Sequence, residues 1–503
     1  MVDFARDEAT LGVVGAGAMG QGIAQVALTG GLRVRLYDVD AGARQAARDQ
    51  VAKRLDRLVE KGQLDAAARD AAMGRLDLAD GLDAFVDCDA VVEAVVERLD
   101  VKREVFAALE ATVRPDCLLA SNTSSIPIAR IASALTHRGR VAGLHFFNPV
   151  PLMKLVEVVA APDSDVSTLD ALEALGRRLG RDPVRVKDVP GFLVNLAGRA
   201  YITEALHILG EGVAGVEDID AVMRDCCGYR MGPFELMDLT GLDVNYPVCM
   251  TVFEGFFADP RLRTTPGHAA LYNAGRLGRK TGQGFHAYAE GKKVVTETTP
   301  PVAADPLPAI VLLAEDARLL QLARDTGVVV LAADDGASPI VTALPRGRDA
   351  TQAAFDTGVD PARLVAVDTE FDTATRITVM TPPGADKQAR DLVVGWLAGP
   401  CGLKVTVIKD SPGFIAQRIQ AAVANLGCEI AQQGLAAPAD IDRAVKLGLN
   451  YPQGPLELAD HMGPGRVLDM LSRLQAITGD DRYRPSLWLR RRALLGLSAL
   501  EPD

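Results

Sequence analysis

The chain has few cysteines and no long apolar run. Its 503 residues include seven cysteines, of which Cys226 and Cys227 are adjacent, and no pair has C-x-x-C spacing. Neither a disulfide framework nor a zinc site is therefore indicated, and we predict no metal. No apolar stretch is long enough to cross a membrane, and residues 1–10 are polar and acidic, unlike a signal peptide. We expect a cytoplasmic protein without a membrane partner.

The chain also lacks an excess of positive charge. It has 54 lysines and arginines against 66 acids, a formal net charge of -12, and its basic run Arg490–Arg492 is too short for a nucleic-acid surface. Apolar content of 48% and charged content of 24% are those of a globular protein. A chain of this length is too long for one hydrophobic core, so we expect several domains and no nucleic-acid partner.

A glycine-rich turn follows the first apolar segment. Residues 15–20 read G-A-G-A-M-G, after L-G-V-V and before helical periodicity. Gly15 permits a tight strand-to-helix turn, Gly17 lets the backbone approach a pyrophosphate, and Gly20 lets helix and strand pack closely. A second strand, Leu32–Tyr37, ends at Asp38, 18 positions after Gly20 (38 minus 20), where an NAD-binding fold places its ribose carboxylate. The pattern predicts NAD rather than NADP, because a carboxylate repels a 2′-phosphate.

Polar side chains follow two further predicted strands. Asp89–Glu97 is predicted as a buried parallel strand that ends in acids, and Lys102 follows Glu97 by five. Cys117–Ala120 is predicted as another strand, which leads into five small polar residues, Ser121–Ser125. Ligands of open α/β sheets bind at the carboxyl ends of strands. An exposed ion pair at a helix start and an N-cap are the structural alternatives for these two groups.

One histidine and one glutamate stand out in the stretch Leu144–Val159, which reads L-H-F-F-N-P-V-P-L-M-K-L-V-E-V-V. The prolines after Asn148 end the first apolar run, so two strands joined by a bend are expected to bring His145 and Glu157 side by side. A carboxylate against an imidazole fixes its tautomer and raises its basicity, as a general base requires. A core histidine and a solvent-facing edge-strand glutamate remain the structural alternatives.

The second half of the chain repeats the first. Lys409 to Phe414 (K-D-S-P-G-F) restates Lys187 to Phe192 (K-D-V-P-G-F) at an offset of 222 (409 minus 187), and two further segments match at the same offset. Residues 310–408 resemble a degenerate α/β unit, with strands predicted near residues 310–313, 328–332, 364–367 and 377–380. They contain no glycine-rich turn and no histidine. We therefore expect the second copy to keep the architecture without the chemistry.

Together these motifs resemble the L-3-hydroxyacyl-CoA dehydrogenases. The resemblance rests on G-A-G-A-M-G-Q-G-I-A-Q, S-N-T-S-S, G-L-H-F-F-N-P-V-P-L-M-K-L-V-E-V, K-D-V-P-G-F-L-V-N and G-x-x-M-G-P-F-E-L, in order from about residue 11 to 288. It implies an α/β Rossmann-type NAD-binding domain (1–187) and an all-α, 6-phosphogluconate-dehydrogenase-like domain (188–289). A proline-rich linker (290–308), a degenerate Rossmann-like domain (309–408) and a second helical domain (409–503) would follow, as in longer bacterial members associated with phenylacetate or hydroxybutyrate catabolism.

The resemblance also assigns roles to residues. The catalytic residues would be His145, Glu157, Ser124 and Asn195. Contacts with NAD would come from Gly15, Gly17, Ala18, Met19, Gly20, Asp38, Glu97, Lys102, Ser124, Asn148 and Lys280. The acyl-CoA substrate would meet Ser124, Asn148 and Asn195, with Lys61 and Arg54 at its CoA tail, although Arg54 stands where some members have serine.

The expected activity is NAD-dependent oxidation of a (S)-3-hydroxyacyl-CoA to the 3-oxoacyl-CoA. The alternatives are a dinucleotide-binding protein without turnover and a dehydrogenase of non-CoA hydroxy acids. The acyl group is open between 3-hydroxybutyryl and 3-hydroxyadipyl; a distal carboxylate would require a cation, for which Arg199 and Arg230 are candidates, although surface ion pairing is the expected role of each. Because the single-copy family pairs helical domains across a dimer, we expect an internal pseudo-dimer and leave further homo-oligomerisation open.

Overall fold

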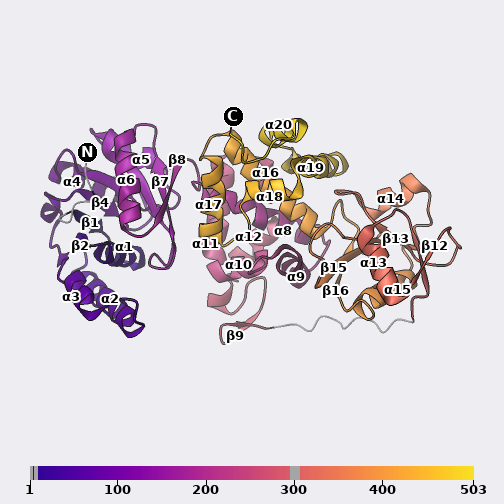
Figure 1. Ribbon diagram of the computed structural model, residues 1–503. Coiled ribbons are helices and arrows are strands. Elements are labelled where there is room, and N and C mark those ends of the chain that lie inside the picture. The colour runs from indigo at the N-terminus through magenta and orange to yellow at the C-terminus, as the bar shows by residue number, and fades with distance from the viewer. Residues whose placement is uncertain (1–3, 5–8, 295–305, 503) are drawn as a thin grey trace. The chain divides into compact units, whose positions relative to one another are not determined.

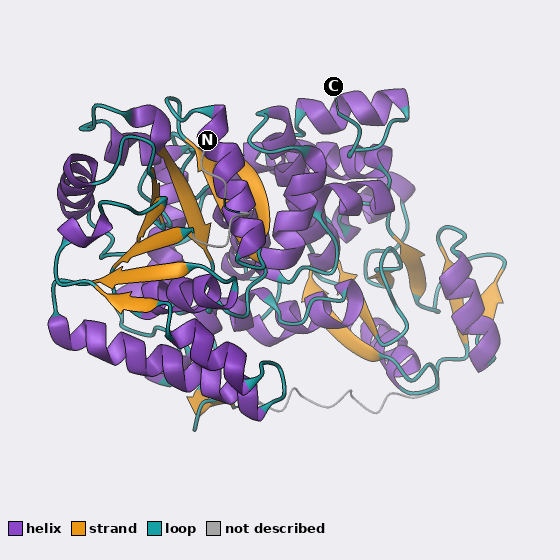
Figure 2. Ribbon diagram, turned by 60° about the vertical axis from the view of Figure 1, so that its left-hand side comes forward, coloured by secondary structure: helices purple, strands orange, loops and turns teal. Residues whose placement is uncertain are grey.

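The computed structural model describes residue 4, residues 9–294 and residues 306–502. The contacts of the chain define two compact units: residues 1–196 with 434–449, and residues 197–433 with 450–503. Figure 1 labels the elements, and Figure 2 shows the strands of both units among helices. The predicted linker at 290–308 falls largely on residues 295–305, which lie outside the described residues.

The first unit is built on an eight-stranded sheet with the order β3-β2-β1-β4-β5-β6-β7-β8. Its strands are β1 Thr10–Val14, β2 Arg33–Tyr37, β3 Leu76–Leu78, β4 Ala90–Glu93, β5 Leu118–Ser121, β6 Val141–Phe146, β7 Leu155–Ala160 and β8 Asp182–Lys187. All neighbours are parallel except β6 and β7, which are antiparallel. The order 3-2-1-4-5-6 of the first six strands is that of a Rossmann fold, which confirms the predicted fold class.

Helices connect the parallel strands. They are α1 Ala18–Thr29, α2 Ala41–Glu60, α3 Ala66–Met73, α4 Leu99–Thr112, α5 Ile128–Ala132 and α6 Val166–Arg178. Ile23, Ala24 and Ala27 form the apolar face of α1 and are fully buried with the β1 side chains of Leu11 and Val13 in one core cluster. Burying such a face supplies most of the stability of a helix in a protein.

The strand predicted over residues 89–97 is too long, because β4 ends at Glu93. The Glu93 carboxylate accepts a hydrogen bond from the N–H of Val95 at 2.7 Å, so the chain turns directly after the strand. Periodicity could not show this end, because the apolar residues continue beyond it.

The second unit contains helices from both repeats. From the first repeat come α8 Arg199–Gly210, α9 Val216–Cys227, α10 Pro233–Thr240, α11 Leu242–Gly255 and α12 Pro266–Asn273. From the second come α16 Ile415–Gln432, α18 Pro455–Met462, α19 Pro464–Thr478 and α20 Leu487–Leu495. Helices α8 and α16, which start the helical part of each repeat, pack against each other. Gly427 on α16 meets Pro455 so closely that an added Cβ would lie 2.4 Å from the proline ring, which brings α16 and α18 together.

A second sheet belongs to the same unit, in the order β12-β11-β13-β14-β15-β16. Its strands are β11 Ala309–Leu312, β12 Val329–Leu331, β13 Ile340–Ala343, β14 Leu364–Val367, β15 Arg376–Thr381 and β16 Lys404–Lys409, with helices α13 Ala317–Thr326, α14 Ala350–Thr357 and α15 Lys387–Ala398. Strands β13 and β16 were not predicted from the sequence. Only β14 and β15 pair antiparallel, as β6 and β7 do in the first sheet.

On each of the two large sheets packs a helix from the other repeat. In the first unit, α17 Pro438–Leu449 of the second repeat packs against β7 and β8, and the N–H of Lys187 donates to the carbonyl of Leu435 at 2.9 Å. In the second unit, α9 of the first repeat packs against β15, and the N–H of Lys409 donates to the carbonyl of Val213 at 3.0 Å. The two bonds are equivalent, because Lys409 lies 222 positions after Lys187 and Leu435 lies 222 positions after Val213. The repeats have thus exchanged helices reciprocally.

Candidate active site

A histidine–glutamate pair lies on two neighbouring strands of the first unit. His145 on β6 and Glu157 on β7 are direct partners in the antiparallel register, and their side chains meet with Nδ1 2.6 Å from Oε2. His145 is 4% exposed and Glu157 is fully buried. The structure therefore confirms the prediction that a proline bend brings these two side chains together.

Backbone donors fix the other oxygen of Glu157. Its Oε1 accepts hydrogen bonds from the N–H groups of Leu193 and Val194 at 3.0 and 2.9 Å. These amides follow the Pro190-Gly191 turn, in which Gly191 has φ 78° and Phe192 has φ 49°. The left-handed turn aims the amides at the carboxylate, and the two bonds hold that carboxylate in place against the imidazole.

Aromatic rings surround the imidazole. The ring centroids of Phe147 and Phe192 lie 4.5 and 5.6 Å from that of His145. The backbone of the same strand is fixed by Asn122, whose Oδ1 accepts from the N–H of Phe146 at 2.9 Å. With Nδ1 against a carboxylate, Nε2 is the nitrogen that remains for proton transfer.

Glu97 organises the polar segment after β5. Its Oε1 accepts from the hydroxyl of Thr123 at 2.6 Å and from the N–H and hydroxyl of Ser125 at 3.1 and 3.0 Å. The N–H of Ser124 donates to the same oxygen at 3.1 Å, and its hydroxyl lies 3.5 Å away. Burial would raise the pKa of Glu97, but these bonds and the charge of Lys102 outweigh it, so its pKa lies below the usual range.

Lys102 has a partner that the sequence analysis missed. Its Nζ lies 2.6 Å from Oε1 of Glu93 and 3.2 Å from Oε2 of Glu97, and the lysine side chain is 1% exposed. Glu93 also accepts from the hydroxyl of Ser121 at 2.6 Å. The predicted solvent-exposed alternative for Lys102 is therefore wrong. Glu93 could have been recognised as the acid in the middle of its predicted strand, four positions before Glu97.

The glycine turn fits a dinucleotide phosphate. A Cβ on Gly15, which has φ 111°, would lie 2.5 Å from the carbonyl of Ala94, and one on Gly20 would lie 1.8 Å from that of Gly15. A Cβ on Gly17 would meet nothing within 4 Å, so the backbone at the start of α1 is open to a bound group. Asp38 accepts from the N–H groups of Ala16 and Asp40 at 2.8 and 3.1 Å, which ties the carboxylate predicted to meet the ribose to the turn.

The remaining predicted contacts come from several different elements. Arg54 on α2 donates to the side chain of Gln21 at 3.2 Å, whereas Lys61 at the end of α2 is exposed. Lys280, in the second unit, pairs with Asp243 at 2.7 Å. Asn148 follows β6, and Asn195 lies on α7 Val194–Ala197, directly after the amides that hold Glu157.

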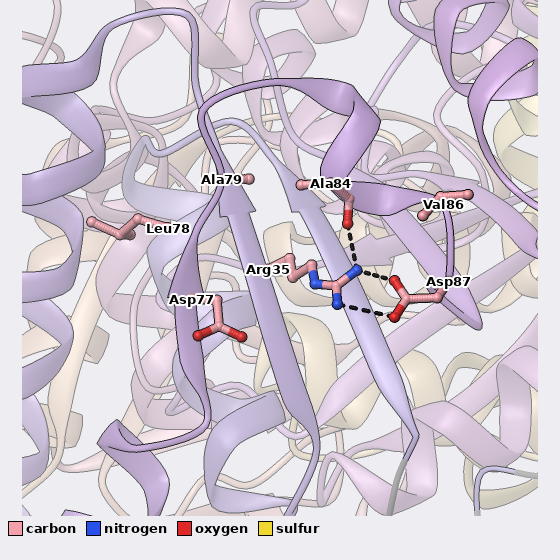
Figure 3. Close-up of a pocket in the computed structure, with 7 residues that line it drawn as sticks. All are labelled: Arg35, Asp77, Leu78, Ala79, Ala84, Val86 and Asp87. Atoms are coloured by element: carbon pink, nitrogen blue, oxygen red, sulfur yellow. Dashed lines mark hydrogen bonds and ion pairs between the residues drawn. The ribbon is translucent and has the colours of Figure 1, made fainter.

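A surface hollow beside β2 and β3 does not overlap this site. Its lining includes Arg35, Asp77, Val86 and Asp87 and none of the predicted site residues. Figure 3 shows that the Arg35 guanidinium faces the Asp87 carboxylate and the carbonyl of Ala84, so its charge is already neutralised. We assign no ligand to this hollow.

The fold and site define a class: a dehydrogenase that binds NAD on a Rossmann domain and has a buried histidine–glutamate pair. Comparison with protein families gives the same result. The model for the 3-hydroxyacyl-CoA dehydrogenase NAD binding domain matches residues 10–189, and the model for the C-terminal domain of that enzyme matches residues 191–288 and 413–499. Residues 342–412 match the 3-hydroxybutyryl-CoA dehydrogenase reduced Rossmann-fold domain. The chain belongs to the 3-hydroxyacyl-CoA dehydrogenase family.

Relatives of nearly the same length and shorter relatives are both similar to this chain. It is 37% identical over 492 residues to the 3-hydroxyadipyl-CoA dehydrogenase of Escherichia coli, covering 97% of this chain and 98% of the relative. It is 41% identical over 286 residues to the 3-hydroxybutyryl-CoA dehydrogenase of Bradyrhizobium diazoefficiens, covering 57% of this chain and 97% of that protein. The crystal structure of 3-hydroxybutyryl-CoA dehydrogenase from Escherichia coli matches with a TM-score of 0.86 at 36% identity, covering 97% of this chain and 98% of that one.

These comparisons establish the activity class: the chain is an NAD-dependent 3-hydroxyacyl-CoA dehydrogenase with a duplicated architecture. In the part of the chain that the structure describes, no helix is both long and apolar enough to cross a membrane.

Proposed function

We propose that this chain oxidises the 3-hydroxyl of a short (S)-3-hydroxyacyl-CoA, 3-hydroxybutyryl-CoA or 3-hydroxyadipyl-CoA, with His145 as the general base. The observation that supports this most strongly is the contact of 2.6 Å between Nδ1 of His145 and Oε2 of Glu157. It leaves Nε2 as the acceptor for the hydroxyl proton, and the carboxylate stabilises the imidazolium that forms. NAD, when bound, accepts the hydride that leaves C3, so proton and hydride depart from the same alcohol.

Ser124 and Asn195 would hydrogen-bond the reacting oxygen, and Asn148 would contact both cofactor and substrate. Neutral donors aimed at an oxygen that gains negative charge stabilise the transition state more than the ground state. The Ser124 hydroxyl is 3.5 Å from Glu97, which is too long to be a strong bond, so it can turn to a substrate at little cost.

For the cofactor, we propose NAD in preference to NADP. The open backbone at Gly17 would bind the pyrophosphate together with the amides of Ala18 and Met19, and Asp38 would accept from the ribose hydroxyls. Asp38 accepts hydrogen bonds from two backbone N–H groups, and these bonds keep it at the end of β2. Glu97, Lys102 and Lys280 remain proposed cofactor contacts, and Lys61 and Arg54 remain proposed contacts of the CoA tail.

The second repeat differs from the first at the two central positions. Val367 pairs with Val379 across β14 and β15, at the positions that lie 222 residues after His145 and Glu157. A protein that only bound a dinucleotide would not need the ionisable pair in either copy. Its presence in one copy, beside valines in the other, supports turnover at a single site.

We also propose that the second repeat takes the place of a partner subunit. The packing of α8 against α16 and the reciprocal exchange of α9 and α17 support an internal pseudo-dimer. Each repeat packs one helix on the sheet of the other repeat. The two repeats therefore cannot be separated without exposing the apolar sheet surface that these helices cover.

Steady-state kinetics test the proposal. NADH oxidation is measured with acetoacetyl-CoA and with 3-oxoadipyl-CoA, and each is repeated with NADPH. We expect turnover with at least one substrate and a kcat/KM that is far lower with NADPH. NADH binding without turnover of either thioester would favour the protein without turnover, and insensitivity to added free CoA would favour a non-CoA hydroxy acid.

A further inference from the structure

A buried lysine bridges two carboxylates where β4 meets α4. Nζ of Lys102 lies 2.6 Å from Oε1 of Glu93 and 3.2 Å from Oε2 of Glu97. The side chains of Glu93 and Lys102 are 0% and 1% exposed, whereas that of Glu97 is 38% exposed. The three charged groups therefore form a chain of contacts that leads from the interior of the first unit to its surface.

The sheet holds the buried end of this chain. Glu93 is the last residue of β4, and its Oε1 accepts from the N–H of Val95 at 2.7 Å as well as from Lys102. Its Oε2 accepts from the hydroxyl of Ser121, the last residue of β5, at 2.6 Å. Three donors around one fully buried carboxylate hold it in a single orientation. Glu93 is thus a fixed negative charge to which Lys102 is bound.

At the exposed end, Glu97 divides its two oxygens between different partners. Oε2 faces Lys102, and Oε1 accepts from the backbone or hydroxyl groups of Thr123, Ser124 and Ser125 at 2.6 to 3.1 Å. A partly exposed glutamate loses rotamer freedom when it is held in one conformation, so it needs a partner to stay there. Because Lys102 takes Oε2, Oε1 is directed to the segment that carries Ser124.

The stability of α4 does not explain the position of Lys102. The residue is the fourth of the helix, and a cation is favoured near the C-terminus of a helix and disfavoured near its N-terminus. Apolar side chains often replace buried ion pairs without a loss of stability. In the second repeat, Ala343 at the end of β13 takes the position of Ser121 (343 minus 121 is 222), so an equivalent strand forms without this hydroxyl.

We propose that Glu93 is a positioning residue of the dehydrogenase, which acts through Lys102 to fix the Glu97 carboxylate and the segment that carries Ser124. This inference rests on the proposed role of Ser124 as a donor to the reacting oxygen. A displacement of about 1 Å in a group that contacts the reacting atoms lowers the rate by about 100-fold. Glu93 is fully buried, so it acts only through its neighbours.

Glu93→Gln removes the charge and keeps the shape. The amide oxygen still accepts from the N–H of Val95, and the hydroxyl of Ser121 turns to accept from the amide NH₂, since a hydroxyl both donates and accepts. The fold is therefore expected to be retained. Lys102, however, loses one of the two negative charges that hold it and moves towards Glu97, which releases the orientation of that carboxylate.

The readout is the steady-state reduction of acetoacetyl-CoA at saturating NADH. We expect Glu93→Gln to lower kcat by about 10- to 100-fold and to change KM for acetoacetyl-CoA by less than about threefold, because the Ser124 contact strengthens in the transition state. Glu104→Gln, at an exposed position of α4, is the matched control and should behave like the wild type.

A second background separates positioning from a general loosening of the fold. In Lys102→Met the link between the two carboxylates is already broken, so adding Glu93→Gln should change kcat by less than about threefold. If Lys102→Met fails to fold, Ser121→Ala provides the second measurement. It frees one oxygen of Glu93 and leaves the contact with Lys102, so we expect a smaller loss, about two- to tenfold, again in kcat and not in KM.

An unchanged kcat in Glu93→Gln would overturn the proposal. Equal losses from Glu93→Gln in the wild-type and Lys102→Met backgrounds, or a loss in Ser121→Ala that appears in KM, would also overturn it and leave Glu93 a structural role. Absence of turnover by the wild type with both acetoacetyl-CoA and 3-oxoadipyl-CoA would instead contradict the proposed function.

Discussion

Nδ1 of His145 lies 2.6 Å from Oε2 of Glu157, and the two residues are direct partners on antiparallel strands. The other oxygen of Glu157 is held by two backbone N–H groups. The carboxylate is therefore fixed from one side by the main chain and presents its other side to the imidazole. This arrangement determines which tautomer the histidine adopts, and hence whether Nε2 can accept a proton.

Replacing Glu157 with glutamine should block the base without changing its shape. The amide oxygen will take the place of Oε1, because the N–H groups of Leu193 and Val194 require an acceptor. The amide NH₂ then faces Nδ1 and moves the imidazole proton to Nε2. We expect kcat to fall by roughly 10³-fold, within the range for general-base catalysis, while NADH affinity stays unchanged. Steady-state kinetics on the variant, with Glu104→Gln at an exposed position of α4 as the control, would check this, and a loss below tenfold would contradict it.

A buried ion pair connects one helix of the first repeat with one helix of the second. Glu204 on α8 and Arg418 on α16 lie 2.7 Å apart, with side chains 3% and 1% exposed. The charge of Arg418 keeps the pKa of Glu204 below its usual range although burial opposes this. Glu204→Gln should destabilise the protein by about 1–3 kcal/mol, because the buried Arg418 keeps its ion pair with the partly exposed Glu211 at 2.8 Å but loses the buried one.

Urea unfolding of the wild type, the two single variants and the double variant measures the coupling free energy between Glu204 and Arg418. The double variant Glu204→Leu with Arg418→Leu should recover part of the loss, since hydrophobic residues of similar size often replace buried ion pairs at little cost. Glu254→Gln, at an exposed position of α11, serves as the control. Additive losses in the double variant would show that the two side chains do not act as a pair.

His286 should make the stability of the second unit depend on pH. Its Nε2 lies 2.7 Å from Asp220 and its Nδ1 lies 3.1 Å from Glu217. Burial would lower the pKa of His286, but the bond to Asp220 and the two negative charges outweigh it, so the pKa is raised above its usual 6.5. A raised pKa means that this stabilisation is fully present below about pH 6.5 and is lost as pH rises through the pKa of the folded state.

His286→Gln should therefore lower the free energy of unfolding more at pH 6 than at pH 9. Urea unfolding at both pH values measures this, with His137→Gln, at an exposed position, as control. An equal loss at the two pH values would mean that His286 acts through packing alone.

The sequence was most informative where chemistry depends on local spacing. The strands predicted over residues 32–37 and 117–120 were found within one residue at each end, as β2 and β5, and the proline bend placed His145 opposite Glu157. Glu93 was missed because a uniform apolar run hides the end of its strand. Arg199 was misjudged as a surface residue although it is 5% exposed, because burial in a helical domain depends on tertiary packing that a single arginine in a helix does not reveal.

The exchange of α9 and α17 was not visible in the sequence. The repeat at an offset of 222 predicts two similar halves, but each half could equally have packed its own helix on its own sheet. The equivalent backbone bonds at Lys187 and Lys409 show the exchanged arrangement. Such choices are made by long-range packing, which periodicity and spacing cannot indicate.

The variant His145→Gln tests the central claim most directly. NADH binding is measured by fluorescence titration, and NADH oxidation is measured with acetoacetyl-CoA and 3-oxoadipyl-CoA, with His137→Gln as the control. If His145 is the general base, the variant binds NADH like the wild type and its turnover falls by roughly 10³-fold or more on both substrates. Near-normal turnover of His145→Gln would contradict the assignment of the active site.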